Sequence, residues 1–181
     1  MREGANEAGF SYVDVMIAVT ILMVGVMAML SAITSGMVMT TTSQQQLAAK
    51  QYALSTVEAI FSARDLDALG FDAVGNVGDT AIPGGVFLSG DGLFYSTAGP
   101  DGIIGTADDA AGPDGVVGTS DDTPPIEGFS RQVVIANIPD PDRPGAPISL
   151  RQIDVTVSYK LGRAQLRETM TSYVANYRTK D

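Results

Sequence analysis

An internal repeat rich in aspartate and glycine is the clearest candidate for ligand chemistry in this sequence. The segments GPDGIIGTADD (residues 99–109) and GPDGVVGTSDD (residues 112–122) lie thirteen positions apart and are identical at eight of eleven positions. Each copy supplies three carboxylates, and its glycines allow backbone carbonyls to turn inward. Hard oxygen ligands of this kind suit Ca²⁺. The candidate ligands are Asp101, Asp108, Asp109, Asp114, Asp121 and Asp122.

The spacing of these aspartates leaves two interpretations open. It is not the spacing of an EF-hand loop, because the D-x-[DN]-x-[DN]-G pattern is missing and no glutamate closes the site. One interpretation is a calcium site, since clustered carboxylates repel one another by about 1 kcal/mol per close pair in water and a cation would remove that penalty. The other is a solvated acidic loop whose Pro-Asp-Gly triplets make turns. We predict calcium, and chelation should then raise protease sensitivity across residues 99–122.

Composition excludes several other kinds of site. The chain has no histidine and no cysteine, so a serine-protease triad and an imidazole or thiolate zinc site are excluded. Adjacent aspartates such as Asp108 and Asp109 point apart on a turn, and no nucleophile with a base accompanies them, so we do not expect an enzyme. The net charge is −10, with twelve acidic residues and no basic one between residues 65 and 130. A nucleic-acid partner is therefore not expected.

A second distinctive feature is a single carboxylate at the start of a long apolar segment. The sequence GFSYVD (residues 9–14) leads into residues 15–33, nineteen positions without a charge. At about 1.5 Å rise per residue this length nearly spans a ~30 Å hydrocarbon core. A carboxylate in lipid costs roughly 2.5–3.5 kcal/mol at the bilayer centre and less near the ends. Asp14 should therefore have a purpose, and one is an interfacial position favoured by the helix dipole, by about 0.3–1 kcal/mol.

The apolar segment continues into an amphipathic one. The polar run TTTSQQQ (residues 40–46) contains no proline or glycine that would stop a helix. Beyond it, apolar residues recur at helical spacing and predict one buried stripe. We predict a helix from about residue 10 to about residue 66, with residues 10–39 in a membrane and residues 40–69 as its amphipathic continuation. The stripe is formed by Leu47, Leu54, Val57 and Phe61, flanked by Ala53 and Ile60.

The remainder of the chain predicts a small sheet. Up to Pro125 the sequence is rich in Gly, Asp and Pro, which indicates loops with one short strand candidate at residues 92–96. Apolar and polar residues alternate in RQVVIANI and RQIDVTVSYK, and a glycine-bearing turn at residues 160–163 predicts a closing hairpin. The fold class is therefore α+β, with a long N-terminal helix on a small antiparallel sheet. Residues 70–181 form the globular part, with the acidic repeat as a loop insertion.

The start of the chain resembles a prepilin processing site, in which a glycine precedes an apolar residue and an acidic side chain follows shortly before the apolar helix. Further along, QQQLAAKQYALSTVEAI and IDVTVSYKLGRAQLRETMTSYVANYR look like minor pilins of the V type and I-type pseudopilins of type II secretion. The resemblance implies a pilin-like fold, a leader over residues 1–9, cleavage after Gly9 by prepilin peptidase, and methylation of Phe10. The family usually has Glu where this chain has Asp14.

The resemblance also implies a function and a location. The chain would be a structural subunit of a type IV pilus or a type II secretion filament, held in the bacterial inner membrane by a single pass with its C-terminal domain in the periplasm. Its partners would be other pilin or pseudopilin subunits, and Asp14 would pair with the N-terminal amine of a neighbouring subunit in the filament core. The alternative is an uncleaved single-pass membrane protein that displays a calcium-binding or adhesive domain.

Overall fold

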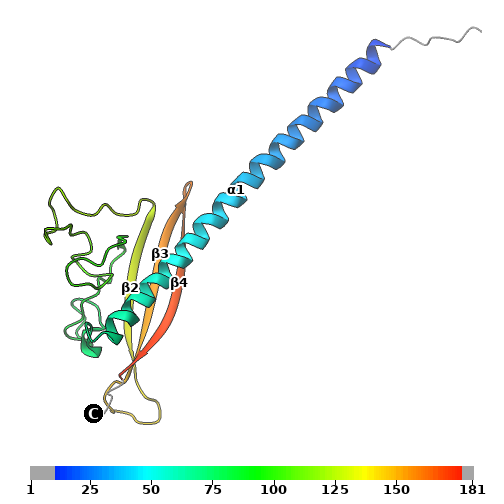
Figure 1. The fold of residues 1–181 in the computed structure, drawn as a ribbon. Helices are drawn as coiled ribbons and strands as arrows, with labels where there is room; N and C mark the ends of the chain where they lie inside the picture. The colour runs from blue at the N-terminus through cyan, green and yellow to red at the C-terminus, as the bar shows by residue number, and fades with distance from the viewer. Residues whose placement is uncertain (1–10, 177–181) are drawn as a thin grey trace, which may run out of the picture. The chain divides into compact units, whose positions relative to one another are not determined.

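The computed structural model describes residues 11–176 and contains one long helix and one four-stranded sheet. Helix α1 (Tyr12–Asp65) ends where Asp67 adopts a left-handed φ of 57°, which aspartate tolerates better than most residues. A short 3₁₀ turn, η1 (Phe71–Ala73), follows. The chain divides into two compact units at Gln44 and Gln45, a boundary that lies within α1. The α+β layout predicted from the sequence is confirmed (Figure 1).

The sheet has the order β1-β2-β3-β4, and all neighbouring strands are antiparallel. The predicted hairpin is confirmed: β3 and β4 are joined by a two-residue loop in which Gly162 has a φ of 60°. A positive φ at the first loop position is typical of the type II′ turn, which suits the twist of the strands. The strand bounds are Gly92–Leu93 for β1, Phe129–Ile138 for β2, Leu150–Leu161 for β3 and Ala164–Ala175 for β4.

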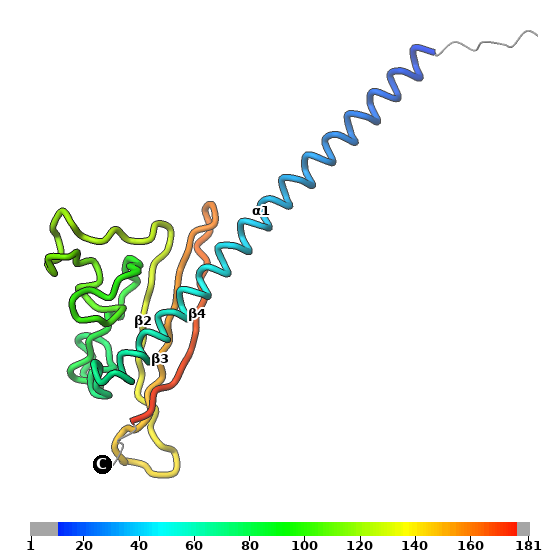
Figure 2. The backbone as a smooth tube through the Cα atoms, in the orientation of Figure 1, coloured from blue at the N-terminus to red at the C-terminus, as the bar shows by residue number. Residues whose placement is uncertain are grey.

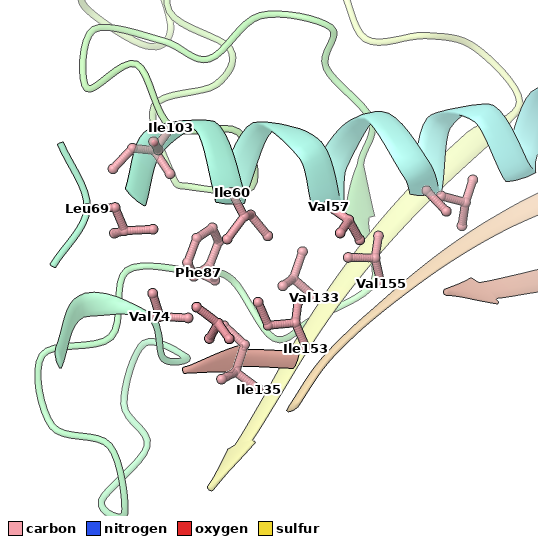
Figure 3. Close-up of a cluster of buried hydrophobic side chains, with 14 of the residues drawn as sticks. Val57, Ile60, Leu69, Val74, Phe87, Ile103, Val133, Ile135, Ile153 and Val155 are labelled. Atoms are coloured by element: carbon pink, nitrogen blue, oxygen red, sulfur yellow. The ribbon is translucent and has the colours of Figure 1, made fainter. Parts of the chain in front are cut away.

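The core lies between one face of the sheet and residues 45–65 of α1 (Figure 3). In β2 and β3 every second side chain points into it, as the alternation predicts: Val133 and Ile135 oppose Val155 and Ile153. Phe87 and Val74, from the loops between the helix and β2, complete the cluster. Among the described residues, nineteen buried apolar side chains make up this core.

The buried face of the helix differs from the predicted stripe. Val57 and Ile60 are buried as expected, and Phe61 is half-buried, but Leu47 and Leu54 are 58% and 44% exposed. Smaller side chains take their places, because small residues let the helix backbone approach the sheet closely. The buried face is therefore rotated by part of a turn from the stripe that the large apolar residues indicated. The face is formed by Ala49, Ala53, Thr56, Val57, Ile60 and Ala63.

The long connection between η1 and β2 carries the acidic repeat, and the chain folds it beside β2 (Figure 2). The side chain of Asn76 ties this connection to the sheet. Its amide nitrogen donates to the carbonyl of Val133 at 2.7 Å, and its oxygen accepts from the N–H of Ile135 at 2.8 Å. Asn76 thereby pairs with β2 as a neighbouring strand would, and satisfies backbone groups in the core.

Candidate functional site

The residues predicted for processing and assembly lie at the start of the chain. Gly9 and Phe10 are outside the described residues. Asp14 lies in the first turn of α1, where its Oδ2 accepts a hydrogen bond from the N–H of Ser11 at 3.2 Å. The hydroxyl of Ser11 in turn accepts from the N–H of Val13 at 3.4 Å. The side chains of Ser11 and Asp14 therefore each accept from a backbone N–H of the first turn and cap the start of the helix.

The first unit presents an uncovered apolar helix. Residues 11–41 are all exposed, and α1 is long and apolar enough to cross a membrane. Six of its hydroxyl groups donate to the carbonyl four residues earlier; Thr20 does so to Met16 at 2.8 Å and Thr34 to Leu30 at 2.9 Å. The same bond recurs at four consecutive positions, residues 40–43. These six hydroxyl groups are thus satisfied within the helix.

The two copies of the acidic repeat fold in the same way. In the first repeat (residues 99–109), Asp108 accepts from the N–H of Asp101 at 3.0 Å and from the hydroxyl of Thr106 at 2.7 Å. In the second repeat (residues 112–122), Asp121 accepts from the N–H of Asp114 at 3.2 Å and from the hydroxyl of Thr119 at 2.7 Å. The local sequence alone specifies this turn, because it forms twice.

The remaining aspartates of each repeat bind backbone N–H groups. Asp101 accepts from Ile103 at 2.7 Å, and Asp114 accepts from Val116 at 2.8 Å. The last aspartate of each copy accepts from a glycine N–H: Asp109 from Gly105 at 2.8 Å and Asp122 from Gly118 at 2.7 Å. These two glycines have φ values of 101° and 98°, which other residues rarely adopt.

The first glycine of each repeat is required by close backbone approach. A Cβ on Gly99 would lie 2.4 Å from the carbonyl oxygen of Asp108, and a Cβ on Gly112 would lie 2.0 Å from that of Asp121. No side chain fits at either position without moving the backbone. The repeat is therefore a compact turn closed by the contact of its first residue with its next-to-last one.

The first repeat is built into the domain. Ile103 belongs to the hydrophobic core, and the carbonyl of Gly105 accepts from the N–H of Leu88 at 3.0 Å. Asp109, 2% exposed, forms an ion pair with Arg131 of β2, which is 6% exposed. The guanidinium of Arg131 also lies 4.9 Å from the centre of the Phe94 ring. The arginine therefore joins the repeat, the sheet and an aromatic side chain.

Burial changes the protonation equilibria of the first repeat. It raises the pKa of Asp109 above its ordinary value of 3.8, against the opposing effects of the Gly105 N–H and Arg131, and it lowers the pKa of Arg131. Both shifts have the sign expected when desolvation outweighs mutual attraction. For Asp108, burial raises the pKa, but the hydroxyl of Thr106 and the N–H of Asp101 outweigh it, and the net pKa is lowered.

The second repeat is exposed. Val116 corresponds to the buried Ile103 and is 55% exposed, and Val117 is 50% exposed. A Cβ on Gly105 would contact Phe87 and Val133, whereas a Cβ on Gly118 would meet nothing within 4 Å. Asp121 is exposed whereas its counterpart Asp108 is half-buried, and the pKa of Asp121 is likewise lowered by the hydroxyl hydrogen bond of Thr119. The same turn thus occurs once in the core and once at the surface.

The six predicted calcium ligands are distributed over these two turns, three in each. Within residues 11–176, no group of three or more acidic side chains is arranged to hold a metal ion. The hydrogen bonds of the six carboxylates account for the shape of both turns, and the Asp109 carboxylate is neutralised by Arg131. Calcium binding stays a prediction.

Three polar residues that the sequence analysis did not single out hold the loops on the sheet. They are Asn76, Arg131 and Arg151. Arg151 of β3 donates to the carbonyls of Phe71 and Val74, and its guanidinium lies 4.3 Å from the centre of the Phe71 ring. The inward orientation of both arginines could have been predicted, because each alternates in step with the inward-facing apolar residues of its strand. Asn76 offers no such signal.

No protein-family model, curated protein or solved structure matches this chain. The structure itself thus provides a membrane-length apolar helix with a capped carboxylate at its start, and a folded domain that carries one buried and one exposed copy of an acidic turn.

Proposed function

We propose that this chain is a structural subunit, a minor pilin or pseudopilin, of a type IV pilus or a type II secretion filament. In this proposal prepilin peptidase cuts after Gly9, Phe10 becomes the methylated N-terminal residue, and α1 carries the subunit from the bacterial inner membrane into the filament. The folded domain then faces the periplasm and later the filament surface. The role of the chain is assembly, and no catalytic step is assigned to it.

The supporting observation is the uncovered apolar surface of α1. Ile21 and Leu22 are 67% and 68% exposed, and each such side chain gains roughly 1.5–3 kcal/mol when fully buried. Over residues 15–33 this sums to tens of kcal/mol, so the segment requires lipid or other protein helices around it. A helix that is apolar on all sides suits both environments, which a subunit must occupy in turn.

Asp14 has a geometry that fits the proposed role in assembly. Its Oδ2 is bound by the N–H of Ser11, which leaves Oδ1 for a second partner. A carboxylate held at the first turn can pair with the N-terminal amine of a neighbouring subunit when helices pack side by side. The low dielectric of a helix bundle strengthens such a pair relative to water.

The mass of the mature N-terminal peptide tests this proposal. We expect a peptide that begins with methylated Phe10 in cells with active prepilin peptidase. Gly9→Val should abolish cleavage and filament recovery, whereas Gly4→Ala, a change in the same leader away from the cut, should leave both intact. An intact N-terminus in the presence of the peptidase would instead support the uncleaved single-pass anchor, and would overturn the proposal.

The role of Asp14 is tested separately from processing. Asp14→Asn keeps an oxygen for the cap of Ser11 but removes the charge, and should reduce filament recovery at least tenfold, equivalent to about 1.4 kcal/mol or more per contact. Asp14→Glu keeps the charge and should restore recovery. Equal recovery with Asn and with Asp would show that the carboxylate is not used in assembly.

A further inference from the structure

The two repeats differ in one respect that points to a partner: the first is bound to a receptor surface within the chain, and the second is not. The first repeat inserts Ile103 into the core, accepts the Leu88 N–H at its Gly105 carbonyl, and pairs Asp109 with Arg131. These three contacts define how this turn binds protein. They are an apolar insertion, a backbone hydrogen bond and a buried ion pair.

The second repeat presents the same three groups at the surface. Val116 stands where Ile103 does and is 55% exposed, against 7% for the isoleucine. The Gly118 backbone has the conformation of Gly105, with φ values of 98° and 101°. Asp122 accepts from the Gly118 N–H at 2.7 Å, as Asp109 does from the Gly105 N–H at 2.8 Å. The binding groups are thus already in the arrangement that the first repeat uses.

We propose that the second repeat, residues 112–122, is a docking element for another protein whose surface offers an arginine beside an apolar recess. Charge complementarity determines this choice, because the segment from residue 65 to residue 130 contains twelve acidic residues and no basic one. An arginine also suits the carboxylate better than a lysine, since its planar guanidinium can bond Asp122 while stacking on an aromatic ring. Arg131 does this with Asp109 and Phe94.

The partner is a different protein and not a second copy of this chain. Within residues 11–176 the chain holds two copies of the docking turn but one receptor, the surface around Arg131, and the first repeat already occupies it. That repeat is covalently attached, so its effective concentration at the receptor exceeds that of any turn from another molecule. Exchange between copies would gain no contact that is not already made.

Site-specific photo-crosslinking in the cells that produce the full chain tests this proposal. The photoreactive residue is placed at Ser120, which is exposed and corresponds to Ala107, a neighbour of Arg131 in the first repeat. We expect one discrete adduct with another protein, and the crosslinked peptide of that protein should contain or adjoin an arginine. The same reactive residue at Val77, exposed but outside the repeats, should not give this adduct.

Variants of the chain distinguish a specific contact from general attraction. Asp122→Asn keeps an oxygen for the Gly118 N–H but removes the charge, and should lower the adduct yield at least tenfold. Val116→Thr preserves shape and the internal hydrogen bonds, and should lower it several-fold. Asp91→Asn removes an exposed charge elsewhere in the acidic region and should change the yield less than twofold. Combining Asp122→Arg with an Arg→Asp change in the partner should restore the adduct.

Three results would overturn the proposal. The first is the lack of any discrete adduct from Ser120. The second is an adduct that Asp91→Asn weakens as much as Asp122→Asn does, which would indicate nonspecific attraction. The third is a crosslinked peptide from the Arg131 strand of a second copy, which would indicate exchange between identical chains.

Discussion

The two acidic repeats have nearly the same sequence and the same internal hydrogen bonds, yet Asp109 is buried against an arginine whereas its counterpart Asp122 is partly exposed. The comparison separates two contributions to structure. The turn itself comes from local residues, since it forms in both environments. Burial comes from the surroundings, because β2 offers Arg131 and an apolar surface to one copy. A repeated sequence can therefore serve as a structural element once and as a surface element the second time.

The largest expected difference between the repeats concerns the buried ion pair. Asp109→Asn leaves Arg131 buried without a countercharge and should lower the free energy of unfolding by about 3–5 kcal/mol. The matched change Asp122→Asn at the exposed repeat should lower it by less than about 0.5 kcal/mol. Urea unfolding of the full chain in detergent, followed by the fluorescence of its tyrosines, measures both. Equal effects would show that the two repeats contribute equally to stability, contrary to the difference in their burial.

A second matched pair tests the apolar insertion. Ile103→Ala removes part of the core and should cost about 2–5 kcal/mol, the usual range for this change at a buried site. Val116→Ala at the corresponding exposed position should cost no more than about 0.5 kcal/mol. The same unfolding measurement applies. A large loss with Val116→Ala would mean that the second repeat is packed against the domain, contrary to its exposure.

Acid should loosen the second repeat before the first. The pKa of Asp121 is lowered from 3.8, so its contribution to stability is present above pH 3.8 and is lost as the pH falls through the lower, folded-state pKa. In the first repeat Asp108 also has a lowered pKa, but that turn is held in addition by Ile103 in the core and by the ion pair of Asp109 with Arg131. Hydrogen exchange at the Gly118 and Gly105 amides, corrected for intrinsic rates, should show earlier deprotection at Gly118. Simultaneous deprotection would contradict this.

The smallest expected effect concerns the predicted calcium. EDTA should raise protease cleavage within residues 112–122 more than within residues 99–109, because Arg131 already neutralises Asp109 and its positive charge disfavours a cation there. Mapping the cleavage sites by mass spectrometry, with and without added Ca²⁺, measures the difference. Unchanged cleavage in both repeats would refute calcium binding.

Much of the fold was predictable because its signals are periodic. The alternation around Val133 and Val155 predicted strands, and the glycine in the loop before β4 predicted the hairpin. The predicted face of the helix was wrong in part: Ala53 and Ile60 are buried as expected, but Leu47 and Leu54 are exposed, and Ala49 was missed because alanine carries little hydrophobic signal although it allows close packing. The distance between the helix and the sheet determines that small residues fit at their interface, and a sequence pattern does not contain that distance.

The candidate site was predictable in its internal geometry but not in its surroundings. The Pro-Asp-Gly triplets indicated turns, and the structure contains the same turn in both copies of the repeat. What distinguishes the copies is Arg131, which lies on a strand distant in sequence and pairs with Asp109 across 22 positions. The alternation of β2 placed this arginine on the inner face, which signalled a buried countercharge. Which carboxylate would meet it depended on the path of the loop.

The hydroxyl groups of α1 affect how easily the helix can move from lipid into a protein interior. Six hydroxyl groups, those of Thr20, Thr34, Thr40, Thr41, Thr42 and Ser43, donate to a carbonyl of their own helix at distances of 2.8 to 3.0 Å. These bonds lie within the segment, so moving it from hydrocarbon to a packed protein interior breaks none of them. For these six residues the move therefore requires no new hydrogen-bond partner in either environment.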